Sequence, residues 1–236
     1  MRADCADETI QTIADLYRQR GRIPRVRLSP VSTPADWPLL LQQAGFAQTD
    51  DRFAYFAVPE KVRLTASAAI RVTRAVSRAD ADSFSVVQVA GFEIPPQHRV
   101  WDRELARRHV GAGRYAFYLA WLDGKAVGAA RSVHLPDGVT VLAALATIPE
   151  ARRHGVGTGL LARMIEDARR IGSSTICGTT IPESYAAGLY SRLGFVHLFE
   201  VQTFVASVQP HVAPEMCECR RCQGWPVPVN SPPNFS

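Results

Sequence analysis

Short apolar runs separated by tight-turn signals predict strands in the middle of the chain. The segments 115–122, 126–134 and 139–146 have the length and apolar content of strands. Asp123-Gly124 and Asp137-Gly138 separate them, and Asp-Gly between apolar runs is a strong hairpin signal. The pattern therefore predicts antiparallel strands joined by hairpins.

A helical pattern follows the last of these strands. One face of the predicted helix is apolar and consists of Leu160, Leu161, Met164, Ile165, Ala168 and Ile171. Charged residues fall largely on the opposite face, and Gly172 is well placed to end the helix. The stretch 145–172 therefore reads as a strand end, a loop and an amphipathic helix.

Similar patterns cover most of the remaining chain. We expect further helices at 8–20, 34–44, 77–89, 102–110 and 186–193, and further strands at 25–28, 53–58, 70–75, 175–179 and 201–205. Ser77 is suited to cap the helix that it precedes, with Asp80 three residues later. The elements predict an α/β (α+β) fold with a mixed, mostly antiparallel central sheet flanked by helices. Its parallel part would lie around the loop 152–158.

One order of elements occurs twice. Helix, strand, helix, Gly-Phe and strand follow one another up to Val58, and the same order returns between Ile165 and Val205. We interpret residues 1–60 as a half-repeat of the later segment, and coincidental α/β patterning is the alternative. The half-repeat lacks a basic glycine loop, so we expect it only to pack, to extend a sheet or to wall a substrate pocket.

The loop Arg152-Arg153-His154-Gly155-Val156-Gly157-Thr158 carries the first chemical signal. A helix N-terminus presents free N–H groups and the positive end of the helix dipole, which suits a phosphate group. Glycine lets the backbone approach an anion closely. The spacing fits neither the P-loop nor the dinucleotide fingerprint. An ordinary strand–helix turn with a solvated basic rim is the alternative.

Composition and charge narrow the classes of function. The chain has 236 residues and a net charge of +5, and a modest positive field suits a polyanionic ligand. Lys and Arg form no run interleaved with aromatic residues, so nucleic-acid binding is not indicated. No apolar run approaches the roughly 18 residues that span a bilayer, and the N-terminus lacks a signal-peptide pattern. We therefore expect a cytoplasmic protein that does not bind membranes.

Two motifs resemble those of the GNAT acetyltransferases. Arg152-x-x-Gly155-x-Gly157 is similar to the R/Q-x-x-G-x-G/A signature of that family, and Tyr190 with Gly194-Phe195 is similar to its LY-x-x-x-GF motif. The motifs occur in the expected order and spacing, and the resemblance covers residues 70–208. It implies a GNAT-like fold in this segment, preceded by the half-repeat 1–60 and a linker at 61–69. A Cys/Pro-rich, partly disordered tail is expected at 209–236.

The resemblance also implies acetyl-CoA as a co-substrate. In the family the glycine loop wraps the pyrophosphate, which assigns this role to Arg152, Arg153, His154, Gly155, Val156, Gly157 and Thr158. The end of the preceding strand, at Leu145, Ala146 and Thr147, would pair with the pantetheine arm. One of its N–H groups would then polarise the thioester carbonyl.

The same resemblance makes Tyr190 the expected general acid, because the family's tyrosine at this position lies near the sulfur of CoA. Its phenol would protonate the departing thiolate. Packing between helix and sheet is the alternative role. The general base is left open between Glu183, where the family often has Asn, and His134.

These expectations combine into one function. We expect an N-acetyltransferase of the acyltransferase class (EC 2.3.1.-) that transfers an acetyl group from acetyl-CoA to a primary amine of a small molecule or peptide. The amine would attack the thioester directly. A non-catalytic acyl-CoA-binding or sensing module is the alternative. The sequence does not indicate the acceptor amine, and it leaves a homodimer open.

Cysteines raise a separate question. Cys217, Cys219 and Cys222 crowd into the tail, and a fourth ligand, His211 or Cys5, would complete a tetrahedral zinc site. A redox-active pair or three free thiols are the alternatives, and a metal-regulated interaction protein is a third function to consider. We therefore assign no metal site. Cys177, in a predicted strand, is expected in the core.

Overall fold

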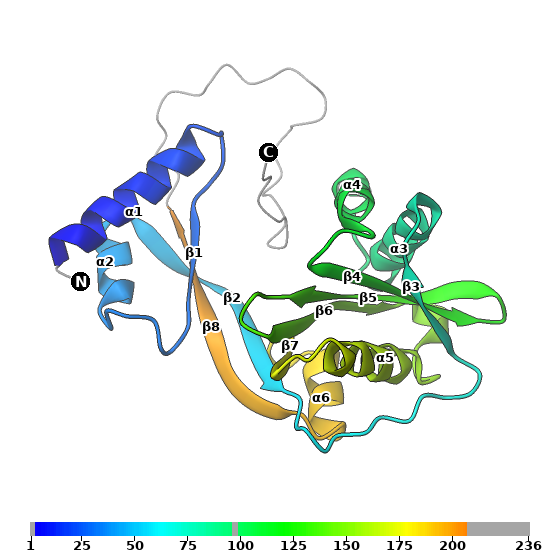
Figure 1. The fold of residues 1–236 in the computed structure, drawn as a ribbon. Helices are drawn as coiled ribbons and strands as arrows, with labels where there is room; N and C mark the ends of the chain where they lie inside the picture. The colour runs from blue at the N-terminus through cyan, green and yellow to red at the C-terminus, as the bar shows by residue number, and fades with distance from the viewer. Residues whose placement is uncertain (1–2, 96–98, 207–236) are drawn as a thin grey trace. The chain divides into compact units, whose positions relative to one another are not determined.

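The computed structural model describes residues 3–95 and 99–206 (Figure 1). The helices and strands are, in chain order, α1 (Ala3–Arg18), β1 (Arg25–Leu28), α2 (Trp37–Gln43), β2 (Phe46–Ala57), β3 (Arg71–Ala75), α3 (Arg78–Gly91), α4 (Arg99–His109), β4 (Tyr115–Leu122), β5 (Lys125–His134), β6 (Val139–Thr147), α5 (Val156–Arg170), β7 (Thr175–Thr180), α6 (Tyr185–Arg192) and β8 (Val196–Ala206). Within the described ranges, no helix is long and apolar enough to cross a membrane. These residues divide into two compact units. The larger is 55–197, and the smaller is 3–54 together with 198–206.

A mixed sheet forms the centre of the larger unit, with the strand order β2-β7-β6-β5-β4-β3. Antiparallel pairing joins β3 to β4, β4 to β5 and β5 to β6, whereas β6 and β7 are parallel. The turn between β4 and β5 has positive φ at both Asp123 and Gly124, as a type I′ hairpin turn requires. The predicted fold class, a mixed and mostly antiparallel sheet, is confirmed.

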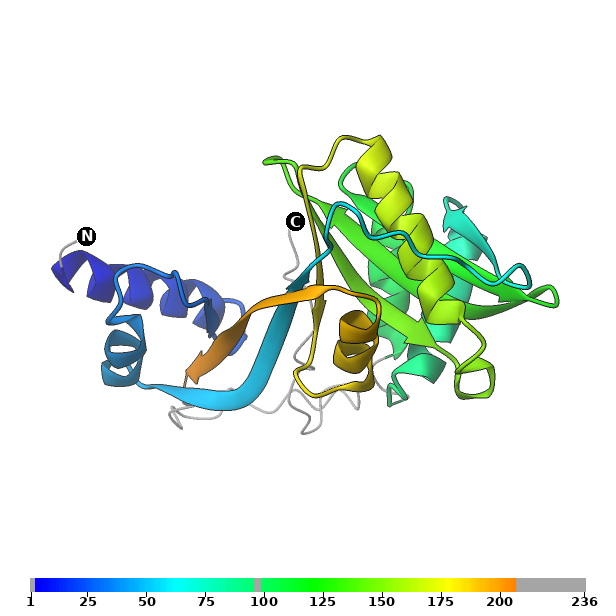
Figure 2. The same ribbon diagram turned by 90° about the horizontal axis from the view of Figure 1, so that it is seen from below.

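Helices cover both faces of this sheet, with α3 and α4 on one face and α5 and α6 on the other (Figures 1 and 2). The core on the α3 side consists of Ala75, Ala81, Phe84, Val87, Ala106, Phe117, Leu119 and Ala129. The predicted apolar stripe of α5 is buried at Leu160, Leu161, Met164 and Ile165. Gly128 of β5 lets α5 lie close to the sheet, because a Cβ there would lie 2.3 Å from Cγ1 of Val156.

The smaller unit is built on β1, β8 and the first part of β2. Antiparallel pairing joins β1 to β8. The core of the unit consists of Ile10, Ala14, Leu40, Leu41, Phe46 and Phe204. The half-repeat and the domain limits that go with it stay predictions, and the tail 209–236 lies outside the described residues.

Several elements begin earlier than predicted: α1 at Ala3, α4 at Arg99 and β8 at Val196, as well as α5 and β2. Gly155, in the left-handed region at φ 83°, starts α5 directly at Val156, so that Gly157 and Thr158 belong to its first turn. β2 begins at Phe46 and not near Phe53. Its polar first half lies beside β8, where the Thr49 hydroxyl donates to the carbonyl oxygen of Thr203 at 3.3 Å. Tertiary pairing, which the apolar pattern does not record, extends this strand.

Candidate functional site

The candidate site begins where β6 and β7 separate. Their parallel pairing runs from Val139 opposite Thr175 to Leu142 opposite Gly178. β6 then continues to Thr147, and in the described part of the chain no residue of β7 is paired with it beyond Leu142. The last residues of β6 therefore keep backbone groups that an extended ligand can use, as an added strand would.

An irregularity in β6 lies in this unpaired stretch. The register with β5 shifts, because Ala143 pairs with Arg131 and Ala146 pairs with Ala129. Ala144 has a φ of 54°, a conformation that L-residues seldom adopt within a strand. The buried Gln88 of α3 donates from Nε2 to the carbonyl oxygen of Ala144 at 2.6 Å. The chain is thus bent at Ala144, and a side chain from α3 holds the bend.

The glycine loop follows β6 and lies at the N-terminus of α5, as predicted. The short 3₁₀ turn Pro149–Ala151 leads into it, and positive φ values at Arg153 (67°) and Gly155 (83°) turn the chain into α5. Gly155 is the N-cap and offers no side chain to accept a hydrogen bond from the first turn. The N–H groups at this helix end are therefore left for an external acceptor.

Three elements meet at the start of α5. A Cβ at Gly157 would lie 3.3 Å from Cδ2 of Leu189 on α6 and 3.8 Å from Cδ2 of Leu145 on β6. A Cβ at Gly155 would lie 3.5 Å from Cβ of Ser67. The structure thus brings the predicted residues of β6, the loop and the Leu-Tyr motif together.

The basic side chains of the loop lie at the surface. Arg152, Arg153 and His154 are all exposed. Arg152 donates from Nη2 to the carbonyl oxygen of Gly91 at 3.2 Å and is 3.5 Å from the carboxylate of Glu93. Arg152 therefore connects the loop to the end of α3. The two guanidinium groups and the imidazole of His154 are accessible to an anion from solvent.

Tyr190 lies on α6 at the point where β6 and β7 separate. Its ring is 1% exposed, stacks on Phe195 at 5.1 Å and meets Phe56 edge-on at 5.5 Å. A Cβ at Gly178, the last paired residue of β7, would lie 3.3 Å from the Tyr190 hydroxyl. Burial raises the pKa of Tyr190 well above its usual range. The phenol is therefore protonated at neutral pH and lies at the last residue of β7 that pairs with β6.

The two candidate bases lie in different places. His134 is paired with Thr140, near the other end of β6, and its Nδ1 is 2.9 Å from Oγ1 of Thr140. Its pKa is lowered, chiefly by burial. Glu183 is exposed and follows β7, next to the N-cap Ser184 of α6. The structure places Glu183, and not His134, at the end of the sheet that carries the glycine loop.

Possible metal ligands and reactive thiols among the described residues form a separate question. No group of three or more His, Cys, Asp or Glu side chains in these ranges could hold a metal ion. Cys217, Cys219, Cys222 and His211 lie outside the described residues, so the zinc hypothesis stays untested. Cys177 is buried, as predicted, and burial raises the pKa of its thiol.

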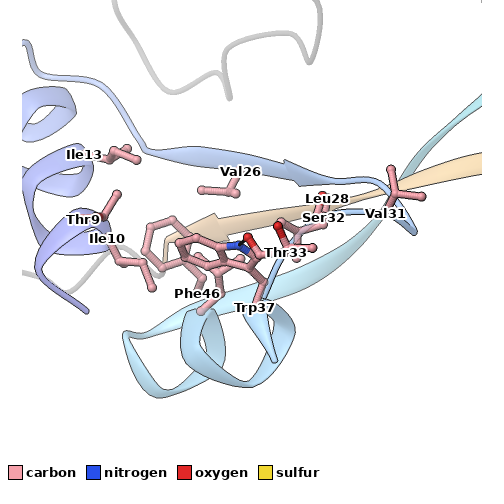
Figure 3. Close-up of a pocket in the computed structure, with 11 residues that line it drawn as sticks. Thr9, Ile10, Ile13, Val26, Leu28, Val31, Ser32, Thr33, Trp37 and Phe46 are labelled. Carbon is pink, nitrogen blue, oxygen red and sulfur yellow. Dashed lines mark hydrogen bonds between the residues drawn. The ribbon is translucent and has the colours of Figure 1, made fainter. Parts of the chain in front are cut away.

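A separate hollow lies in the smaller unit. It measures about 460 Å³ and is lined mostly by apolar side chains, among them Ile10, Val26 and Trp37 (Figure 3). The residues that line it carry no titratable side chain, and Trp37 donates its indole N–H to the carbonyl oxygen of Thr33 at 2.8 Å. This hollow therefore offers shape but no acid or base among the residues that line it.

Comparison with known proteins identifies a family and a fold. The model of the Acetyltransferase (GNAT) family matches residues 74–195. A GCN5-related N-acetyltransferase from Kribbella flavida superposes with a TM-score of 0.66 at 17% identity, over 89% of this chain and 78% of that one. A functionally unknown conserved protein from Staphylococcus epidermidis gives 0.65 at 12% identity, over 87% and 81%.

A tandem GNAT protein from the clavulanic acid biosynthesis pathway is also similar. Its TM-score is 0.61 at 16% identity, over 84% of this chain and 68% of that one. No curated protein sequence matches the chain. At these identities the solved structures support the fold, and the family model carries the assignment to a family.

Proposed function

Because the chain belongs to the GNAT acetyltransferase family, we propose that residues 145–158 bind acetyl-CoA and that the enzyme acetylates a primary amine. Members of the family use acetyl-CoA as acetyl donor, so the chain is an acetyltransferase. One observation carries the proposal. The end of β6 is no longer paired with β7, and it lies beside the N-terminus of α5, which has no side-chain cap. A thioester donor with a phosphorylated end needs these two features side by side.

The residues of the loop fit a diphosphate. Gly155 and Gly157 place no side chain beside the backbone N–H groups of the first turn, where a Cβ at Gly157 would lie 3.3 Å from Cδ2 of Leu189. Helix N-termini bind phosphate through such N–H groups and the helix dipole. The exposed Arg152, Arg153 and His154 add donors around the same point. We assign the pyrophosphate of acetyl-CoA to this loop.

The backbone of β6 would hold the rest of the donor. Leu145, Ala146 and Thr147 lie beyond the last pair with β7, so their outward groups can pair with the amides of the pantetheine arm. One N–H in this stretch would donate to the thioester oxygen, where negative charge develops as the amine attacks. The carbon–sulfur bond then breaks, and the thiolate of CoA needs a proton.

We assign that proton to Tyr190. Its phenol lies over Gly178, at the last position where β7 is paired with β6. Burial keeps the phenol protonated, and the same desolvation would raise the pKa of a thiol that leaves beside it.

The acceptor is proposed at the level of a class. A primary amine of a small molecule or a peptide must lose a proton before or during attack, and Glu183 is the candidate base on the correct side of the sheet, directly or through water. A cytoplasmic location, a homodimer and the absence of nucleic-acid or membrane partners stay predictions of the sequence.

One experiment separates the enzyme from a sensor. The purified chain is mixed with acetyl-CoA and a panel of primary amines, and free CoA is measured with a thiol reagent. We expect amine-dependent release of CoA with at least one acceptor. Binding of acetyl-CoA without release across small-molecule and peptide amines would favour the non-catalytic acyl-CoA-binding alternative.

A further inference from the structure

The peptide between Ala144 and Leu145 has an unusual position in the sheet. Ala143 and Ala146 pair with β5, but in the described strands neither Ala144 nor Leu145 has a partner in the β5 register or in that of β7. The positive φ of Ala144 turns this peptide out of the ladder. A partly buried carbonyl that leaves a ladder needs another donor, because an unsatisfied one is costly.

Gln88 supplies that donor. It is 3% exposed, and its Nε2 lies 2.6 Å from the carbonyl oxygen of Ala144 and 3.3 Å from that of Ala129 on β5. Both neighbours are acceptors only, so the amide nitrogen and not the amide oxygen must face them. One side chain thus binds both strands at the irregularity.

The direction of the Leu145 N–H follows from the geometry of the peptide. In a trans peptide the C=O and the next N–H point in opposite directions within one plane. The C=O of Ala144 points toward Gln88 on α3. The N–H of Leu145 therefore points away from α3, and α5 and α6 lie on the opposite face of the sheet (Figure 2). The Leu145 side chain reaches Gly157 on that side.

Contacts at both ends hold α3 in place. Ser77 and Asp80 form a capping box at its start. Near its end, a Cβ at Gly91 would lie 2.8 Å from Cβ of Ala146 and 3.1 Å from the backbone nitrogen of Thr147. The helix therefore lies directly on the last residues of β6, and Gln88 cannot move away without disturbing that contact.

We propose that Gln88 is a positioning residue that fixes the Leu145 N–H as the donor to the thioester carbonyl of acetyl-CoA. This inference rests on the proposed function and makes it more specific, since it selects one N–H of the 145–147 stretch. Gln88 does not touch the donor. It acts by holding the Ala144 carbonyl, so that the opposite end of the same peptide is oriented before acetyl-CoA binds.

The test reads the carbonyl directly. Acetyl-CoA labelled with ¹³C at the acetyl carbonyl is bound to the wild type, to Gln88→Met and to Val87→Ala, and the C=O stretch is recorded by difference infrared spectroscopy. Gln88→Met keeps the volume but removes the donor. Val87 is buried on the same helix and bonds to neither carbonyl, so its variant controls for loss of stability.

We expect a lower stretching frequency in the wild type and in Val87→Ala than in free acetyl-CoA, and a frequency near the free value in Gln88→Met. Turnover should fall by about 10- to 100-fold in Gln88→Met, below the loss for a deleted oxyanion donor, with acetyl-CoA affinity nearly unchanged. An unchanged frequency shift in folded Gln88→Met would overturn the inference while leaving the proposed function in place.

A second measurement needs no variant. In protein labelled with ¹⁵N-leucine, the amide proton of Leu145 should move downfield more strongly with acetyl-CoA than with CoA, because only the acetylated form carries the carbonyl. Equal shifts with both ligands would contradict the role of Leu145. A wild type that binds neither ligand would refute the proposed function and this inference together.

Discussion

The ring of Tyr190 is held by Phe56, Phe195 and the backbone of Gly178. Packing therefore does not decide whether Tyr190 is also an acid, since both roles need the ring in this place. The hydroxyl group distinguishes the packing role from the acid role. It contributes little to the aromatic contacts, but it is the group that would protonate the thiolate.

At this scale we predict that Tyr190→Phe lowers kcat by about 10²- to 10⁴-fold, the usual range for general acid catalysis, and leaves acetyl-CoA affinity nearly unchanged. The matched control is Tyr185→Phe, an exposed tyrosine on the same helix. Single-turnover rates of both variants, under conditions where chemistry is limiting, provide the measurement. A Tyr190→Phe rate equal to that of the control would leave Tyr190 a packing residue.

Gly128 decides how closely α5 approaches the sheet. A Cβ there would lie 2.3 Å from Cγ1 of Val156 and 3.0 Å from Cδ1 of Leu160. We predict that Gly128→Ala lowers the free energy of unfolding by about 1–3 kcal/mol, the usual cost of overpacking a core. Chemical denaturation is the measurement.

Gly188→Ala is the matched control for this variant. Gly188 lies within α6, and an added Cβ would meet only the end of the Arg192 side chain. Removing a helical glycine is expected to stabilise by about 0.5–1 kcal/mol. Equal effects of the two substitutions would contradict the close packing of α5.

At the scale of elements, the cap of α3 links local sequence to the site. Asp80 accepts hydrogen bonds from the backbone nitrogens of Val76 and Ser77, both at 2.9 Å. The bond from Val76 is the largest cause that holds the pKa of Asp80 below its usual value of 3.8. A carboxylate with a depressed pKa stabilises the fold above its unfolded pKa, and that stability is lost as pH falls through the folded pKa.

We therefore predict that Asp80→Asn is less stable than the wild type at neutral pH, by about 0.5–2 kcal/mol as for other capping residues. The difference should shrink as pH falls below about 3.8, where the wild-type carboxyl becomes protonated as well. Urea denaturation at pH 7 and near pH 3 measures it. A difference that does not change with pH would show that the charged carboxylate is not what stabilises the helix.

Local elements were predicted more successfully than the features that depend on tertiary contacts. β4 and its Asp123-Gly124 turn, as well as the Ser77 cap, follow from residues close in sequence, and the structure has all of them. The bend at Ala144 was missed, because the alanine-rich run around it contains no glycine or proline. Its donor, Gln88, lies 56 residues away, and a polar residue within the otherwise apolar run 86–90 was the one available signal.

At the scale of the whole molecule, the two units differ in chemistry. The larger unit carries the glycine loop, the bent strand and Tyr190. The smaller unit, within its described residues, has no glycine loop at a helix N-terminus, and its hollow is lined by side chains that carry no charge. We therefore propose one acetyl-CoA site per chain, at residues 145–158.

Calorimetric titration with acetyl-CoA tests this claim most directly, on the wild type, on Gly157→Glu and on Ala79→Glu. Gly157→Glu puts a bulky negative side chain where the pyrophosphate would lie, whereas Ala79→Glu makes the same charge change at an exposed position of α3. We predict one site per chain in the wild type and in Ala79→Glu, and no detectable binding in Gly157→Glu that still shows the wild-type circular dichroism. Two equivalent sites per chain, or unchanged affinity in Gly157→Glu, would contradict the account.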